Sequence, residues 1–82
     1  MKIRVTRKHI KQGKWKNARS CPIALALVGC GLNDVVVGSS EADIKGQCCL
    51  PLPKTARRFI ERFDHGKPVK PFVFNLKIKE TT

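Results

Sequence analysis

The segment LPKTARRFIERFDHGKPVKPFVF, residues 52–74, carries the clearest structural pattern in the chain. Within it, apolar side chains recur at i, i+3, i+4 and i+7, which is the spacing of one helix face, at Ala56, Phe59, Ile60 and Phe63. Pro53 suits a helix start and Gly66 a helix end. The sequence therefore predicts an amphipathic helix over residues 54–65.

The outer face of this helix is basic. Arg58 and Arg62 lie one turn apart without an acidic partner at the same spacing, so together they are candidates to bind a phosphate or a carboxylate. The alternative is a solvated face whose arginine stems cover the edge of the core.

The sequence predicts strands both before and after this helix. After the basic linker 67–71, apolar and polar residues alternate over 72–78, which is typical of a strand with one face in the core. Before the helix, residues 35–37 form a valine run, and residues 42–48 alternate again. These two segments are predicted to form a hairpin.

The first third of the chain adds a short strand over 2–5, a short helix over 7–12 with Thr6 as its cap and Gly13 at its end, and an apolar helix over 21–30 that Ser20 can cap. The predicted fold is α+β in a single domain, 1–82. Four strands form one mostly antiparallel sheet, with the two main helices packed on one face. Residues 80–82 are expected to be a frayed tail.

The charge is distributed unevenly. The chain has a formal net charge of +11, and its first nineteen residues hold eight Lys or Arg and no acid. A fold does not require such a field, which raises self-repulsion and attracts polyanions. The expected partner is therefore nucleic acid, DNA or RNA, or an acidic or nucleic-acid-bound host protein.

The basic N-terminal strand and loop, residues 1–19, form the main candidate contact region. Its candidate binding residues are Lys11, Lys14, Trp15, Lys16 and Arg19, to which Arg58 and Arg62 are added. Trp15 either forms a stacking or cation–π platform among phosphate-binding charges, or plugs the edge of a thin core.

Catalysis is not expected, and neither is a cofactor or a metal. The four cysteines, Cys21, Cys30, Cys48 and Cys49, lack the spacing of zinc ribbons and are predicted to be buried thiols, although metal binding by Cys48 and Cys49 stays open. The enzyme hypothesis depends on one pair, Cys48 or Cys49 with His65.

Three runs together carry a resemblance to a known group of proteins. They are VTxxHIxxG (5–13), CPIALA (21–26) and LPxxARRFIxxFDxGxPVxPFxF (52–74). The chain resembles small uncharacterised proteins encoded by bacteriophages and prophages, over about residues 2–78. The resemblance implies a phage origin and a place of action in the bacterial cytoplasm. It carries over no catalytic residues.

Two functions compete on these observations. The first is a small basic accessory protein that binds nucleic acid, or a nucleic-acid-bound host complex, without catalysis. The second is a phage inhibitor of a bacterial defence enzyme, similar to an anti-CRISPR protein, in which the charges serve specificity and association rate. No membrane segment is expected, and the sequence does not indicate an oligomeric state.

Overall fold

The computed structural model describes residues 1–77, apart from the side chain of Cys48. It confirms the α+β class. The elements in chain order are β1 Lys2–Val5, α1 Arg7–Gln12, α2 Pro22–Gly29, β2 Val36–Val37, β3 Glu41–Ile44, β4 Gln47–Pro51, α3 Lys54–Asp64 and β5 Phe72–Asn75. The predicted strand residue Ile78 and the predicted frayed tail, 80–82, lie outside the described residues.

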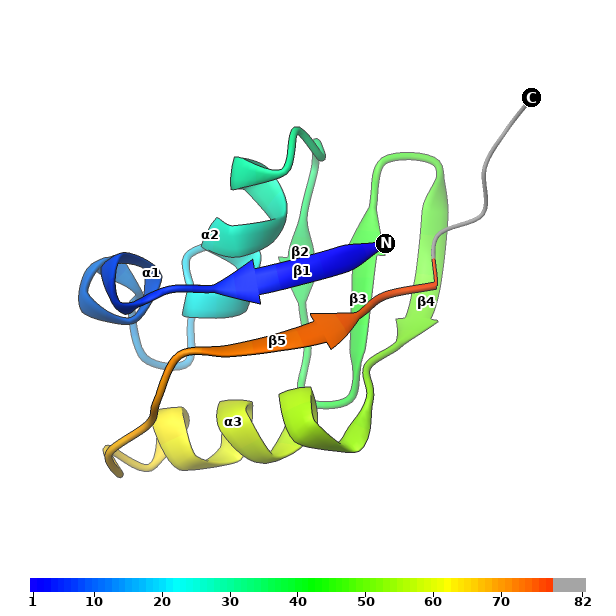
Figure 1. The fold of residues 1–82 in the computed structure, drawn as a ribbon. Coiled ribbons are helices and arrows are strands. Elements are labelled where there is room, and N and C mark those ends of the chain that lie inside the picture. The colour runs from blue at the N-terminus through cyan, green and yellow to red at the C-terminus, as the bar shows by residue number, and fades with distance from the viewer. Residues whose placement is uncertain (78–82) are drawn as a thin grey trace.

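The strands form two antiparallel sheets, so the prediction of one four-stranded sheet is wrong. β1 pairs with β5 in a two-stranded ribbon, and β2, β3 and β4 form a three-stranded sheet in that order. Figure 1 shows the β1–β5 ribbon crossing in front of the second sheet, with its strands running across those behind.

The additional strand comes from the segment predicted as a single strand over 42–48. The chain reverses at Lys45 and Gly46, and β3 and β4 pair on either side of this turn. Gly46 has φ +81°, a left-handed conformation that glycine adopts without a steric penalty. The apolar alternation continues through the turn and therefore conceals it.

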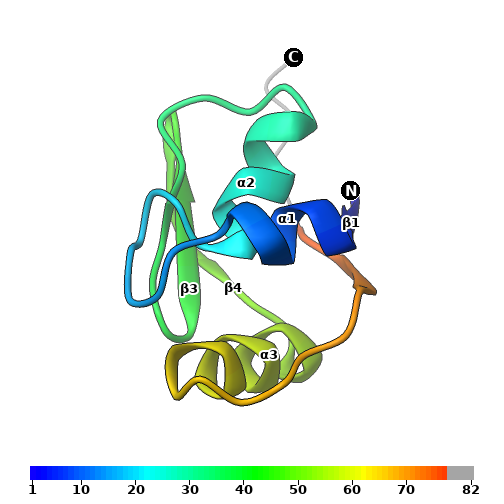
Figure 2. The ribbon, with the colours of Figure 1, turned by 90° about the vertical axis from the view of Figure 1, so that its left-hand side faces the viewer.

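The core lies between the two sheets. Figure 2 shows the three-stranded sheet on one side, the ribbon on the other, α2 between them and α3 closing the space below. The two main helices therefore do not share one face of a common sheet, contrary to the prediction. The rings of Phe59 on α3 and Phe72 on β5 lie 4.8 Å apart between centroids, which ties α3 to the ribbon.

Local signals at the helix starts explain the bounds. The predicted limits of α1 are confirmed: Thr6 Oγ1 accepts a hydrogen bond from the His9 N–H, and His9 Nδ1 accepts one from the Thr6 N–H. The cap of α2 is Cys21 rather than Ser20, since Cys21 Sγ accepts from the Ala24 N–H at 3.4 Å.

Over residues 1–77, no helix has the length and apolar character needed to cross a bilayer.

Candidate functional site

The basic loop, residues 14–20, begins where α1 packs against α2. A Cβ built on Gly13 would lie 2.6 Å from Cδ and Cγ of Pro22 and 2.8 Å from its nitrogen. No side chain fits this space, because real contacts at a Cβ are essentially never so short. Gly13 therefore permits the close approach of the two helices that fixes both ends of the loop.

The basic loop is closed by its own backbone. The Lys14 N–H donates to the carbonyl of Ser20 at 2.9 Å. Asn17 Oδ1 accepts from the N–H groups of Arg19 and Ser20, both at 3.1 Å. These bonds hold the loop in one conformation while its basic side chains remain exposed.

Two further hydrogen bonds fasten the basic loop to the rest of the fold. The Val37 N–H in β2 donates to the Ala18 carbonyl at 2.7 Å, and the Lys16 N–H donates to Asp64 Oδ1 on α3 at 3.1 Å. Lys16 has φ +52°, which is uncommon for a residue with a side chain and costs roughly 1–2 kcal/mol. The contact with Asp64 offsets part of this cost.

Trp15 lies on the surface of the basic loop. Its side chain is 67% exposed, so the interpretation as a plug of the core edge is wrong. One edge of the indole, at Cη2 and Cζ2, lies about 3.5–3.6 Å from the position of a Cβ on Gly66. The turn after α3 therefore supports one edge of the ring, and most of the ring surface is available to a ligand.

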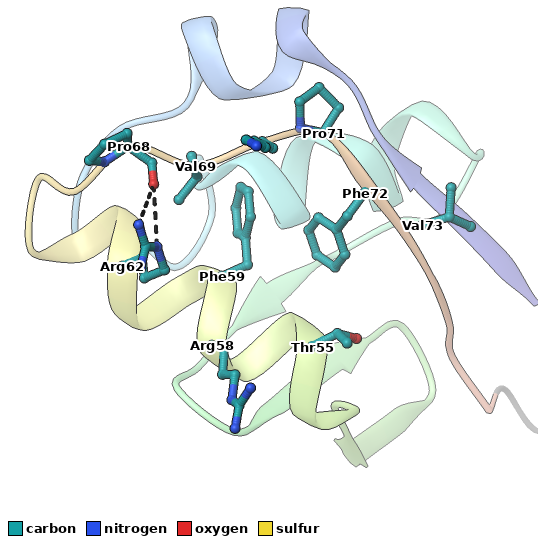
Figure 3. A pocket seen from close by; sticks show the side chains of 10 residues that line it. Thr55, Arg58, Phe59, Arg62, Pro68, Val69, Pro71, Phe72 and Val73 are labelled. Atoms are coloured by element: carbon teal, nitrogen blue, oxygen red, sulfur yellow. Dashed lines mark hydrogen bonds between the residues drawn. The ribbon is translucent and has the colours of Figure 1, made fainter.

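The structure separates the two candidate arginines of α3. Arg62 Nε and Nη2 donate to the carbonyl of Pro68 at 3.3 and 3.1 Å. Figure 3 shows Arg62 directed toward Pro68 and Arg58 directed away from it. The two guanidinium groups thus do not converge on one ligand in this conformation, whereas Arg62 and Trp15 both contact the turn that follows α3.

A groove of about 630 Å³ lies between α3 and the segment 68–73. Its floor is mainly apolar, with Phe59, Val69 and Phe72 among its lining residues, and its basic members are Arg58, Arg62 and Lys70. This concavity was not predicted, because its two walls meet only in the folded chain.

Basic side chains surround the molecule. Sixteen of the seventeen Lys and Arg fall in residues 1–77, and all of these are exposed, including Lys11 on α1. Within that part of the chain the structure records no ion pair. The positive field is consequently not neutralised internally.

Cys21, Cys30 and Cys49 differ in burial. Cys21 is buried, and burial raises the pKa of its thiol, which makes it a poor nucleophile near neutral pH. Cys30 and Cys49 are exposed, so the prediction of buried thiols is wrong for both. Cys48 and Cys49 lie in β4, which leads into α3, whereas His65 follows the opposite end of that helix.

Among the described residues, no three His, Cys, Asp or Glu side chains are grouped as metal ligands. His65 instead contacts the Glu61 carbonyl through Nδ1 at 2.7 Å.

The structure adds residues of β5 to the basic N-terminal strand and so forms a second exposed face. The β1–β5 ribbon turns Ile3, Val5 and Phe74 into the core, so the alternate positions point outward. They are Lys2, Arg4, Val73 and Asn75. The alternation of residues 2–5 was recognised, but its pairing with residues 72–75 was not.

Comparisons with known proteins do not add to this description. The chain matches no family model, no curated protein and no solved structure.

Proposed function

We propose that this protein binds nucleic acid through its basic surface, without catalysis. The observation that carries the proposal is the basic loop: a largely exposed tryptophan stands among Lys14, Lys16 and Arg19 on a backbone closed by hydrogen bonds. Exposed aromatic rings among basic side chains are typical of surfaces on which bases stack while the charges contact phosphates.

Affinity in this proposal comes mainly from phosphate contacts. Each phosphate neutralised by a Lys or Arg releases counterions, so binding should weaken steeply as salt rises. Little ordering is needed for binding, because the backbone of the basic loop already has one conformation. Stacking on Trp15 would add affinity for unpaired bases with little sequence preference.

The proposed setting follows from the resemblance. As a phage or prophage product, the protein would act in the bacterial cytoplasm, on free nucleic acid or on a nucleic-acid-bound host complex. Such a role requires no cofactor and no membrane.

The test is a titration of labelled single- and double-stranded DNA and RNA at low and physiological salt. We expect the triple variant Lys14→Glu, Lys16→Glu, Arg19→Glu to fold normally and to lose binding. A matched control reverses three exposed charges elsewhere, at Lys45, Lys54 and Arg57, and should retain more of the binding. No binding by the wild type at either salt concentration would refute the proposal. An equal loss of binding in both variants would show that the basic loop is not the binding surface.

A second candidate is an inhibitor of a bacterial defence enzyme, such as a CRISPR effector, that acts by protein–protein contact. The groove between α3 and residues 68–73 favours it, because apolar concavities are more typical of protein interfaces than of phosphate-binding surfaces. For this candidate, Val69→Asp at the groove should abolish inhibition of the enzyme, and nucleic acid should bind only at low salt.

A further inference from the structure

The β1–β5 ribbon presents four side chains on its outward face. Lys2 pairs with Asn75 and Arg4 with Val73, so these side chains form two adjacent cross-strand pairs. All four are exposed. Within residues 1–77 the ribbon has no third strand, and Figure 2 shows it as the outermost layer on its side of the molecule.

The chain segments that form this face and its flanks carry basic residues but no acid. No acid occurs in residues 1–19 or 65–79, the two segments that contain the ribbon and its flanks. Arg7 follows β1, and Lys70 and Lys77 stand on either side of β5. A hollow of about 410 Å³ lies beside the ribbon and is lined by Arg4, Arg7, Pro71 and Val73, among others. It places Arg7 at the margin of the face, next to Arg4.

We propose that the outward face of the β1–β5 ribbon enters the major groove of duplex DNA. This inference rests on the proposed nucleic-acid function and names its element and its ligand. Lys2, Arg4, Val73 and Asn75 face the base edges, while Arg7, Lys70 and Lys77 contact the phosphates on the rims of the groove.

The dimensions fit this ligand. Paired strands lie about 4.8 Å apart, and the major groove of B-form DNA is about 12 Å wide, so a two-stranded ribbon with its side chains fills it. The side chains fit as well. Arg and Lys bind the acceptor edge of guanine, Asn binds adenine through two hydrogen bonds, and an apolar group such as Val73 packs on the thymine methyl.

The same geometry excludes other nucleic acids from this face. The major groove of A-form RNA is deep and narrow, and side chains do not reach its base edges. Single strands have no groove to receive a ribbon. The ribbon therefore predicts a preference for duplex DNA, whereas the basic loop with Trp15 predicts no such preference.

Asn75→Ala tests the base contact, because it changes no charge. The wild-type protein is first used to select its best-bound sequences from a pool of random-sequence DNA duplexes. We expect Asn75→Ala to bind these sequences about 5-fold more weakly or worse, because one bidentate base contact is lost. The dependence of binding on salt should stay unchanged, since no phosphate contact is lost. An Asn75→Ala protein that selects the same sequences with unchanged affinity would overturn the inference.

A double variant tests the whole face. Lys2→Thr with Arg4→Thr removes two charges and retains side chains suited to a strand. Lys45→Thr with Lys54→Thr is the matched control, since it removes two exposed charges that lie outside β1 and β5. Circular dichroism and thermal unfolding of both variants verify the fold.

We expect only the ribbon variant to lose the preference for duplex DNA over double-stranded RNA and single-stranded DNA. Equal behaviour of the two variants, with nucleic-acid binding intact, would overturn the ribbon inference alone. Absence of nucleic-acid binding by the wild type would overturn the proposed function as well.

Discussion

The basic loop and the β1–β5 ribbon carry charge of the same sign on opposite sides of the molecule. Figure 2 shows the loop beside the three-stranded sheet and the ribbon on the far side of the core. In the loop, hydrogen bonds hold the backbone in place, and Lys16 adopts a left-handed conformation. In the ribbon, the side chains occupy alternate positions of regular strands whose inner face is buried.

This difference shows how two regions with charge of the same sign can suit two kinds of contact. The loop presents charges around an aromatic ring, which suits phosphates and unpaired bases. The ribbon presents charges and an amide at fixed spacing on a narrow element, which suits a groove. One straight duplex cannot lie against both sides of the molecule, so the two regions are expected to respond to mutation independently.

The largest expected effect concerns what holds the ribbon. Ile3 is 0% exposed, and Ile3→Ala should lower the free energy of unfolding by about 2–5 kcal/mol, because it leaves a cavity beneath β1. Chemical denaturation measures the loss. Ile3→Val, with an expected cost of about 0.5–1.5 kcal/mol, keeps the test quantitative if the alanine variant does not fold. If each variant lost less free energy of unfolding than its own expected range, the stability of the ribbon would not depend on its inner face.

The next effect concerns what holds the loop. Gly13→Ala forces a methyl group against the ring of Pro22 and should cost about 1–3 kcal/mol. Gly29→Ala is the control, since its Cβ meets only His9 Nε2 at 3.8 Å and alanine favours a helix. Thermal unfolding should therefore show a lower midpoint for Gly13→Ala only. Equal midpoints would mean that α1 and α2 shift apart without cost.

A third prediction separates the two regions by ligand. Trp15→Ala should leave the free energy of unfolding within about 0.5 kcal/mol, because the side chain is mostly exposed. It should weaken binding of single-stranded DNA by about 1–3 kcal/mol for each base that stacks on the ring, and affect duplex DNA less. Fluorescence anisotropy on both ligands measures this difference. An equal loss on duplex DNA would contradict the separation.

The smallest effect concerns the link between Lys16 and Asp64. Asp64→Ala and Asp64→Asn both remove the charge, but only asparagine keeps an acceptor for the Lys16 N–H. Amide hydrogen exchange at Lys16 should be faster in the alanine variant by about 2- to 10-fold, as expected for one hydrogen bond of about 0.5–1.5 kcal/mol. Identical rates in the two variants would show that the loop is held without Asp64.

Local signals in the sequence were sufficient for α1 and for the start of α3, but they misplaced the cap of α2. The bounds of α1 and the start of α3 follow from Thr6, Gly13 and Pro53, which act within one turn of their positions. Local signals were not sufficient to predict the strands and their pairing. The turn at Lys45 and Gly46 was concealed because glycine fell on an apolar position of the alternation, although glycine is itself a common turn residue that supplies positive φ.

The candidate site was predictable only in part. The exposed bases of residues 14–19 were recognised from composition alone. That Asp64 holds Lys16, 48 positions away, and that Pro68 engages Arg62 depend on the tertiary fold, which the sequence pattern does not encode locally. The half of the ribbon's outward face that lies in residues 72–75 was missed for the same reason.

The pairing of β1 with β5 also bears on how the chain is made. The two strands lie about 70 positions apart, and closing so long a segment delays their contact until much of the chain is available. At a synthesis rate of about 5–20 residues per second, β1 is synthesised roughly 4–14 s before β5 is complete. During that interval Ile3 and Val5 have no partner strand, and no truncated product can display the paired face. The face is therefore present only on chains translated through residue 75.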